Sequence, residues 1–248
     1  MGLSKNKIKF IRKLEKKKYR YENQVFVAEG IKIIRDLLHS NMRIREIIGQ
    51  AEIIEKLNIP QTIPVTIAAE EEMRRISFQS TPQGIMAIVE MPRWQITPTD
   101  AENNFLLMLD GVQDPGNLGT IIRVADWFGI RAVVCSNDTV DVYNPKTVQS
   151  AMGSVFRMPV IYTDIEGFLA QVTSPVYGTF MQGKPINEIS FGQGGVIIMG
   201  NEAHGIRASV EKLITEKITI PRYHSGPGPE SLNVAMATGI VLWEVRRN

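Results

Sequence analysis

One short segment sets the expected fold of the C-terminal half: Asn117-Leu118-Gly119-Thr120-Ile121-Ile122-Arg123. It follows the apolar run Phe105 to Leu109 and a turn rich in Gly, Pro, Asn and Asp, and it continues into apolar residues at helical spacing. This succession predicts a strand, a loop and a helix. Such a loop offers backbone N–H groups to an anion, and Arg123, about one turn into the helix, can grip a phosphate with two N–H groups. Taken alone, the segment fits a plain βα turn with an exposed arginine equally well.

Two later segments strengthen this prediction, because both lie at the end of an expected strand. The second segment is Gly200-Asn201-Glu202-Ala203-His204-Gly205-Ile206, directly after the apolar run Val196 to Met199. The third begins with Ile220-Pro221 and, after a connection rich in Gly and Pro, continues with Ser231-Leu232-Asn233-Val234-Ala235. Ligands of parallel α/β sheets bind at the carboxyl ends of the strands. The three segments are therefore expected to converge on one site.

These segments resemble the three ordered motifs of the SpoU (TrmH-type) RNA 2′-O-ribose methyltransferases, a family of the knotted SPOUT superfamily. The motifs read Asn-x-Gly-x-x-x-Arg, Gly-Asn-Glu-x-x-Gly, and Ile-Pro followed by Ser-Leu-Asn-Val. The matching residues are Asn117, Gly119 and Arg123; Gly200, Asn201, Glu202 and Gly205; and Ile220, Pro221, Ser231, Leu232, Asn233 and Val234. The sequence departs from the family at residues 222–230, where the connection is longer and Arg222 stands at a position that commonly holds methionine.

The resemblance implies an α/β protein with a knotted, mostly parallel SPOUT-type sheet in its C-terminal half and a smaller ribosomal-protein-like RNA-binding domain before it. It implies transfer of a methyl group from S-adenosylmethionine to a ribose 2′-hydroxyl of structured RNA, with ribosomal RNA ahead of transfer RNA. It also implies a homodimer formed through the catalytic half. The catalytic group carried over is Asn117, Arg123, Glu202, Ser231 and Asn233. The residues carried over for the cofactor are Thr179, Gly200, Asn201, Gly205, Ile220 and Leu232.

The predicted roles follow from side-chain chemistry. Arg123 is expected to bind the phosphate beside the target ribose rather than to act as a general base, because a guanidinium stays protonated in proteins. From there it can stabilise charge as the hydroxyl ionises. Ser231 and Asn233 are expected to orient the hydroxyl. Glu202 is expected either to fix Arg123 or to accept a proton through water, and it also fits an acid favoured at a helix N-terminus.

Composition argues against several other classes. The net charge is +2 and 44% of the residues are hydrophobic, which is ordinary for a globular protein. No apolar run approaches the roughly 18 residues of a membrane helix, and the N-terminus does not resemble a secretory signal, so no membrane partner is expected. The lone Cys135 fits a reducing cytoplasm. The histidines His39, His204 and His224 lack zinc-like spacing, so no metal is expected.

Positive charge is concentrated at the N-terminus. Residues 1–20 contain nine Lys or Arg and one Glu, a net charge of +8, which leaves −6 for the remaining 228 residues. Ile8, Ile11 and Leu14 can form a thin apolar stripe on a helix whose other faces are basic. One interpretation is an arm that contacts RNA phosphates without regard to sequence. The other is an ordinary solvated helix face.

The chain is expected to divide near residue 92, into an N-terminal RNA-binding domain (1–91, with the basic arm 1–20), a linker (92–101) and a catalytic domain (102–248). Two segments resemble landmarks of the family's RNA-binding domain, although each also fits a local turn or loop: Phe26-Val27-Ala28-Glu29-Gly30 and Pro82-Gln83-Gly84-Ile85-Met86-Ala87. Expected strands of the first domain are 25–28, 44–48, 65–67 and 85–89, with helices near 31–39, 52–57 and 70–75. In the second, strands are expected at 105–110, 132–135, 176–180, 195–200 and 217–220, and helices near 120–128, 145–152, 165–171, 206–213 and 232–245.

Two other functions stay open at this point. A catalytically inactive RNA-binding protein of the same fold is kept in play by the altered connection at 222–230. An unrelated nucleotide-dependent α/β enzyme is disfavoured, because the sequence has neither a Gly-x-Gly-x-x-Gly nor a Walker-type loop.

Overall fold

The computed structural model describes residues 2–228 and 230–247. The chain forms two compact units, and each unit is made of two separate segments of the sequence. Unit 1 comprises Met1–Arg93 together with Asp141–Arg157, and unit 2 comprises Trp94–Val140 and Met158–Asn248. Among the described residues, none of the helices has the length and hydropathy that a membrane crossing requires.

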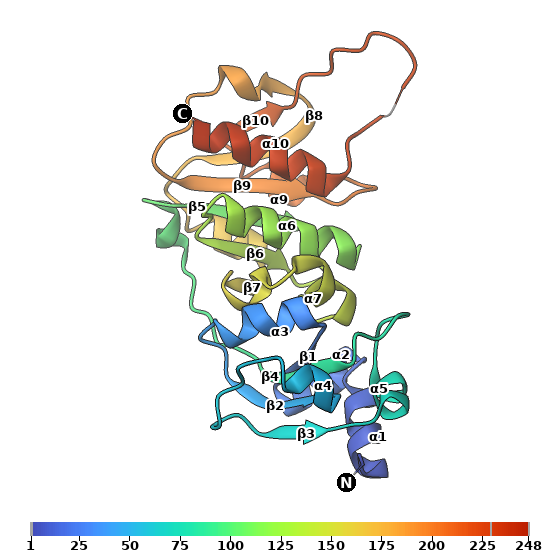
Figure 1. The fold of residues 1–248 in the computed structure, drawn as a ribbon. Coiled ribbons are helices and arrows are strands. Elements are labelled where there is room, and N and C mark those ends of the chain that lie inside the picture. The colour runs from blue at the N-terminus through green and yellow to red at the C-terminus, as the bar shows by residue number, and fades with distance from the viewer. Residues whose placement is uncertain (1, 229, 248) are drawn as a thin grey trace. The chain divides into compact units, whose positions relative to one another are not determined.

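Unit 1 is built on a four-stranded sheet of order β1-β4-β2-β3 (Figure 1). β4 lies antiparallel to both β1 and β2, and β3 pairs with β2 in parallel. The strands are β1 (Val25–Glu29), β2 (Ile44–Gly49), β3 (Val65–Ile67) and β4 (Ile85–Glu90). The helices from the first 93 residues are α1 (Lys5–Lys13), α2 (Lys17–Asn23), α3 (Ile31–Leu38), α4 (Ala51–Ile54) and α5 (Glu70–Ile76). All four strands expected in this part of the chain are confirmed.

The basic N-terminal segment is part of the unit 1 core rather than a detached arm. Ile11 and Leu14 are buried and pack with residues of α5 and the sheet, so the predicted apolar stripe is confirmed. Arg20 is buried at 2% exposure and is ion-paired with Asp141, with its Nε 3.1 Å from Oδ2. Lys7 is ion-paired with Glu46. Arg20 is therefore withdrawn from solvent, and Lys7 is held by an ion pair within unit 1.

A segment from the second half of the sequence completes unit 1. Residues 141–157 contain α7 (Pro145–Ala151) and the 3₁₀ turn η2 (Ser154–Phe156). The rings of Tyr143 and Phe156 stack on Phe26 of β1, with centroids 4.6 and 6.4 Å apart. Offset aromatic pairs at such distances add to the area they bury. The sequence had placed this segment in the catalytic domain, because nothing local indicates its distant partner.

Unit 2 is a six-stranded parallel sheet of order β10-β8-β9-β5-β6-β7. Its strands are β5 (Phe105–Asp110), β6 (Ala132–Ser136), β7 (Val160–Thr163), β8 (Val176–Pro185), β9 (Gly195–Gly200) and β10 (Glu216–Thr219). β7 was absent from the predicted strands, because Val160–Thr163 is short and only half-buried. The register of β8 against β10 shifts between Lys217 and Ile218, so that residues 179–183 bulge from the pairing. The parallel α/β fold class is confirmed.

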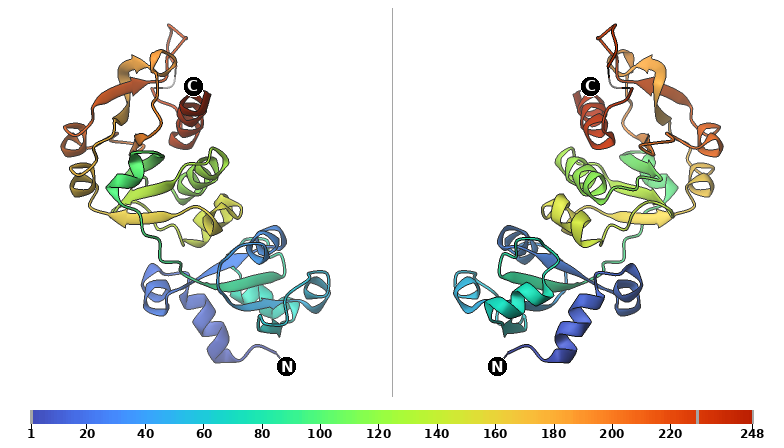
Figure 2. Two further views of the ribbon diagram at one scale, coloured as in Figure 1. Left: turned by 90° about the vertical axis from the view of Figure 1, so that its left-hand side faces the viewer. Right: turned by 90° about the vertical axis from the view of Figure 1, so that its right-hand side faces the viewer.

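Helices cover both faces of the unit 2 sheet (Figure 2). α8 (Ile165–Leu169) and α9 (Ala208–Glu211) pack on the face that presents Leu106, Val134 and Ile198. α6 (Pro115–Trp127) and α10 (Val234–Arg247) lie side by side on the other face. Because both faces are covered, the central strands β5 and β9 carry no polar side chain before Asp110, the last residue of β5, as expected for a buried parallel sheet.

α6 begins earlier than the sequence pattern predicted. Asp114 caps it, accepting a hydrogen bond from the backbone N–H of Asn117 at 2.8 Å, and Pro115 occupies its first turn. The predicted loop position of Asn117 is therefore wrong, since this residue lies in the first turn of the helix. Arg123 lies more than two turns from the start rather than about one.

Candidate active site

The first two motifs meet at the ends of adjacent strands. Asp110, the last residue of β5, pairs with Gly200, the last residue of β9. The first motif continues from β5 into α6, and the second forms the loop that follows β9. The third motif starts after β10 and returns to the same region at the start of α10 (Figure 1). The predicted convergence at the carboxyl ends of strands is present in the structure.

A chain of hydrogen bonds joins one side chain from each motif. Asn117 Nδ2 donates to Glu202 Oε1 at 2.9 Å. Asn233 Nδ2 in turn donates to Asn117 Oδ1 at 2.9 Å. The second oxygen of Glu202 accepts a longer bond, 3.4 Å, from the backbone N–H of Gln113. The side chains of Asn117, Glu202 and Asn233 are exposed or half-buried, so this hydrogen-bonded network lies where a substrate can reach it.

The loop of the second motif is tightly turned, and its glycines and asparagine explain how. Asn201 and Gly205 exchange two backbone hydrogen bonds of 2.9 Å. A Cβ on Gly200 would lie 2.5 Å from the backbone nitrogen of Ile206, and Gly205 has a φ of +69°, which side chains rarely allow. The Asn201 side chain closes the loop, because its Oδ1 accepts from the backbone N–H of Ala203 at 2.8 Å. Its Nδ2 donates to the backbone oxygen of Gly111 at 2.6 Å, which ties this loop to the first motif.

An ion pair that the sequence did not reveal holds the same two motifs together. Asp110, only 1% exposed, accepts from the backbone N–H of Arg207 at 2.8 Å and from its Nε at 2.6 Å. Partial burial acts to lower the pKa of Arg207, but the attraction of Asp110, Asp138 and Glu166 outweighs it and the pKa is raised. Asp110 was not among the predicted site residues. Its position directly after an apolar strand was the available signal that its carboxylate would be buried.

Arg123 lies apart from the hydrogen-bonded chain within this single molecule. Arg123 is six positions after Asn117, and a step of six positions turns about 240° around an α-helix, so the two side chains leave α6 on different sides. Arg123 is exposed, as are Thr120 and Trp127, which flank it at helical spacing. In the described part of the chain its guanidinium has no hydrogen-bond or ion-pair partner. Glu202 bonds to Asn117 instead, so the expected contact between Glu202 and Arg123 is not found.

The remaining candidates surround this centre with less definite contacts. Ser231 and Leu232 are exposed and directly precede Asn233. Ile220 is half-buried at the end of β10, and Thr179 Oγ1 donates to the backbone oxygen of Ile198 at 2.9 Å. The hydroxyl of Thr179 therefore already has a partner in β9.

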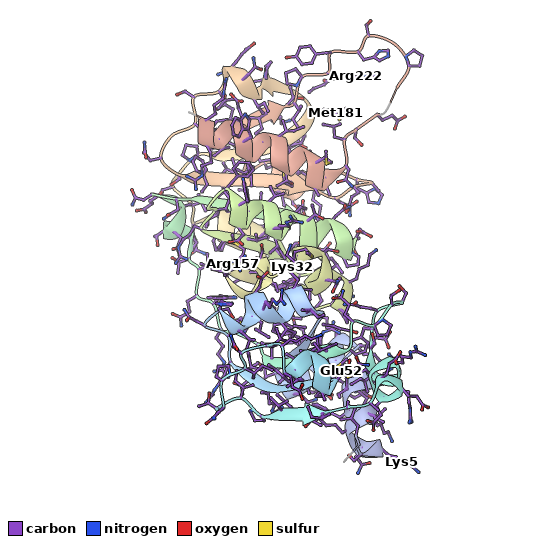
Figure 3. The ribbon with its side chains drawn as sticks, viewed as in Figure 1. Lys5, Lys32, Glu52, Arg157, Met181 and Arg222 are labelled. Atoms are coloured by element: carbon purple, nitrogen blue, oxygen red, sulfur yellow. The ribbon has the colours of Figure 1, made fainter. Side chains whose placement is uncertain are left out.

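The long connection after β10, which carries Arg222 (Figure 3), is mostly exposed. It has hydrogen bonds of its own. Arg222 donates to the backbone oxygen of Gly226 at 2.7 Å, and the Gly226 N–H donates to His224 Nδ1 at 2.7 Å. Tyr223 is 92% exposed. Pro229 of this connection lies outside the described residues.

The parallel sheet with polar motifs at its strand ends defines unit 2 as the ligand-binding part of an α/β enzyme. Comparison with protein families makes this specific. Residues 104–243 match the SpoU rRNA Methylase family, and residues 5–87 match the MRM3-like substrate binding domain. The chain belongs to the SpoU rRNA methylase family.

Similar proteins extend over almost the whole chain. The 23S rRNA (guanosine(2553)-2′-O)-methyltransferase RlmP of Bacillus subtilis (strain 168) is 34% identical over 97% of this chain and 96% of its own length. A Porphyromonas gingivalis protein of the TrmH family of RNA methyltransferases has a solved structure that superposes with a TM-score of 0.88. It is 38% identical and covers 100% of this chain and 99% of its own. The AdoMet-bound rRNA methyltransferase from Sinorhizobium meliloti superposes with a TM-score of 0.86. It is 31% identical and covers 100% of this chain and 96% of its own.

Proposed function

We propose that the protein transfers a methyl group from S-adenosylmethionine to a ribose 2′-hydroxyl of ribosomal RNA. The observation that supports this most directly is the chain Glu202–Asn117–Asn233, which joins side chains from all three family motifs by bonds of 2.9 Å. Relatives named as rRNA 2′-O-methyltransferases cover the chain nearly end to end. An inactive RNA-binding protein has no comparable support, because every polar residue of the three motifs is present.

The polar chain is suited to orienting a hydroxyl. The Nδ2 of Asn233 donates a hydrogen bond to Asn117. The Oδ1 of Asn233 accepts one, at 3.0 Å, from the backbone N–H of Ala235 at the start of α10. Its position is thereby fixed from two sides. Ser231, exposed two residues earlier, can donate to or accept from the ribose hydroxyl. Glu202 can accept the proton that the hydroxyl loses, directly or through water.

Arg123 acts on charge rather than on the proton. Its guanidinium is exposed and is not used by the described residues of the same molecule, so it is free to bind the phosphate next to the target ribose. A planar guanidinium binds phosphate with two parallel hydrogen bonds and cannot act as a base at neutral pH. The oxygen that develops negative charge during the transfer is stabilised by a fixed cation nearby.

The residues of the second and third motifs fit a cofactor held largely by backbone groups. In the tight loop from Gly200 to Gly205, a Cβ at Gly200 would meet the backbone of Gly205 and Ile206, so the turn requires glycine there. Leu232, 52% exposed, and half-buried Ile220 supply apolar surface for an adenine ring. Thr179 is hydrogen-bonded to Ile198 of β9, and Asn201, directly after β9, is hydrogen-bonded to Gly111. When bound, S-adenosylmethionine supplies an electrophilic methyl group on a sulfonium.

We also infer that the protein forms a homodimer through α6 and α10. The outward sides of these neighbouring helices expose Trp127 at 85%, Met236 at 64%, Ile240 at 39% and Trp243 at 59%. Large exposed apolar residues on two neighbouring helices are typical of a protein interface, and the same surface on two copies can form a twofold dimer. Arg123 lies four residues before Trp127, hence on the same side of α6, where it would adjoin the second copy.

Sedimentation velocity at micromolar concentration tests the dimer. The wild type should sediment as a dimer and Trp243→Asp as a folded monomer. Tyr223→Asp is the matched control, because it places the same charge at an exposed aromatic outside this surface. A monomeric wild type with full activity would remove the inference.

Labelled methyl transfer tests the reaction. Purified protein with S-adenosylmethionine bearing a tritiated methyl group should label ribosomal RNA and leave transfer RNA unlabelled. Absence of label from both RNAs, with the protein folded and the cofactor bound, would contradict the proposal.

A reducing cytoplasm is the expected setting, since the only cysteine, Cys135, is buried in β6 and burial raises the pKa of its thiol.

A further inference from the structure

Unit 1 contains a groove of about 520 Å³ that the proposed reaction does not use. Its walls come from β1, from residues 78–83 and from the first part of α7, and they combine amide, hydroxyl and ammonium groups with apolar carbon. The volume is within the range of sites for small molecules. A second groove in unit 1 is lined by Glu52, Glu70 and Glu72, and these acids would repel an anionic ligand.

In the first groove, the side-chain oxygens of Gln149 and Gln83 accept hydrogen bonds from neighbouring protein groups. Gln79 Nε2 donates to Gln149 Oε1 at 2.7 Å and to the backbone oxygen of Glu29 at 3.1 Å. The backbone N–H of Ile31 donates to Gln83 Oε1 at 3.2 Å. Within residues 2–228 and 230–247, the Nε2 atoms of Gln149 and Gln83 have no hydrogen-bond partner. Each therefore leaves two N–H donors for a ligand.

The wall that faces α7 is fixed by a buried carboxylate. Glu29 is 5% exposed and accepts hydrogen bonds from the Ser77 hydroxyl and, at 3.0 Å, from the backbone N–H of Phe78. Burial raises the pKa of Glu29, although these two bonds and the charge of Arg12 act against the rise. Because both carboxylate oxygens are occupied by protein donors, Glu29 shapes the groove rather than offering acceptors to a ligand. A wall fixed in this way needs little reorganisation on binding.

Positive charge adjoins the donors. Lys146, on the first turn of α7, lines the groove and is exposed. The guanidinium of Arg12 lies over the ring of Phe78, 5.4 Å from its centroid, and donates to the backbone oxygen of Ser77 at 2.8 Å. Phe78 itself lines the groove and is half-buried. The groove thus combines fixed amide donors, an aromatic ring and Lys146, and Arg12, which also ion-pairs with Glu15 at 3.5 Å, adds a second cation at the Phe78 ring rather than on the groove wall.

We propose that this groove binds one unstacked nucleotide of the RNA substrate, with an acceptor-bearing edge of the base on the amides of Gln149 and Gln83 and the flanking phosphates on Lys146 and Arg12. The edges of an unpaired base expose carbonyl and ring-nitrogen acceptors that pairing hides, and single-stranded RNA is recognised through such edges. A paired base cannot reach the donors without leaving its helix. The proposal rests on the proposed function, because it takes RNA as the substrate, but the groove lies in unit 1 and takes no part in methyl transfer.

The test compares two glutamine substitutions in the full-length protein. Gln149→Glu keeps the oxygen that accepts from Gln79 but replaces the free N–H donors with a second acceptor. Gln61→Glu makes the same charge change at an exposed position of unit 1 that does not line the groove. The probes are a fluorescent single-stranded RNA heptamer of mixed sequence and a blunt duplex of the same length. Binding is measured by anisotropy, and kcat and KM for deproteinised ribosomal RNA are measured alongside.

Gln149→Glu is expected to weaken binding of the single strand about tenfold and to raise KM for ribosomal RNA while kcat stays the same, because it removes paired donors without touching unit 2. Gln61→Glu should change both values less than about twofold, and the duplex should bind all three proteins weakly. Equal affinities of the two variants for the heptamer, or equal affinity of the wild type for duplex and single strand, would overturn the proposal. Failure of the wild type to methylate any RNA would instead remove the proposed function, and heptamer binding would still decide the groove.

Discussion

Asn117 is the residue at which the three motifs meet. Its Nδ2 donates to Glu202 and its Oδ1 accepts from Asn233, while its backbone N–H bonds to the capping carboxylate of Asp114. The oxygen and one N–H of the side chain are therefore used by protein neighbours. We propose that Asn117 is a positioning residue that aligns Glu202 and Asn233.

A double-mutant cycle tests that role. Asn117→Ala and Asn233→Asp should each lower kcat at least about tenfold, and the double variant should be little worse than either. Asn233→Asp keeps the oxygen that accepts from Ala235 at the start of α10 but loses the N–H donated to Asn117, so its fold should be retained. Single-turnover rates give the coupling free energy. Strictly additive losses would show that the two side chains act independently.

Arg123 should be essential for the reaction and dispensable for the fold. Because its side chain is exposed and not used by the described residues of the same chain, Arg123→Ala should change the free energy of unfolding by less than about 0.5 kcal/mol. It should lower kcat by at least about a hundredfold, as removal of a transition-state cation does. Arg123→Lys should also be poor, because an ammonium cannot make the two-point contact.

Arg45→Ala is the control for this substitution, since Arg45 is another exposed arginine and lies in unit 1. Urea unfolding, cofactor binding and single-turnover methyl transfer should be measured on all four proteins. Turnover near the wild-type rate in Arg123→Ala would place Arg123 outside the reacting centre.

Glu29 gives a pH dependence with a defined sign. Burial raises its pKa in the folded state, so protonation favours folding. Its contribution to stability is complete below the ordinary glutamate pKa of about 4.3 and is lost as the pH rises through the raised value. Glu29→Gln removes this titration, and its amide can still bond Ser77 and the Phe78 N–H. In urea unfolding from pH 4 to 8, the free energy of unfolding of the variant should increase relative to that of the wild type as the pH rises. A constant difference across that range would contradict the raised pKa.

At the scale of elements, most apolar strands and several helix starts, those of α3, α5, α7 and α8, were predictable, whereas the start of α6 was not. β5 and β9 were expected from their apolar runs, and both have the predicted bounds. The start of α6 was missed because Pro115, Gly116 and Asn117 read as loop formers, whereas the cap at Asp114 allows all three in the first turn. The contacts of Asn117 with Glu202 and Asn233 required the observed fold, since residues 85 and 116 positions apart have no local signal.

α1 shows how one helix combines a structural face with a charged one. Ile11 is fully buried, so Ile11→Ala should lower the free energy of unfolding by about 2–5 kcal/mol. Deletion of residues 1–20 would remove this core and the buried Arg20, and would unfold unit 1 rather than test RNA binding.

Removing positive charge from α1 and the residues after it is a better test of the proposed contact with RNA. Lys5 (Figure 3), Lys9 and Lys16 are exposed, and changing all three to Gln should leave stability unchanged. The affinity for ribosomal RNA should fall, and the slope of log affinity against log salt should become shallower by up to about 2 if all three contact phosphate. The methylated position should stay the same, because phosphate contacts do not read sequence. An unchanged salt slope would mean that these lysines are only solvated.

At the scale of the whole molecule, the order of the motifs was accessible from the sequence, but the composition of unit 1 was not. Tyr143 and Phe156 stack on Phe26, and Asp141 neutralises Arg20, across more than a hundred residues of sequence. Breaking such a buried pair leaves an uncompensated charge, so these contacts tie residues 141–157 firmly into unit 1. The threading of the C-terminal segment through a loop, implied by the family resemblance, stays a prediction.

The central claim is that the methyl group goes to a ribose oxygen, and nucleoside mass spectrometry tests it most directly. Ribosomal RNA methylated by the wild-type protein should be digested to nucleosides, and the new product should be a single 2′-O-methyl nucleoside. A substrate with 2′-deoxyribose at the mapped nucleotide should accept no methyl group, and Arg123→Ala should give no product above background. A methylated base in place of the methylated ribose, or undiminished transfer to the deoxy substrate, would contradict the account.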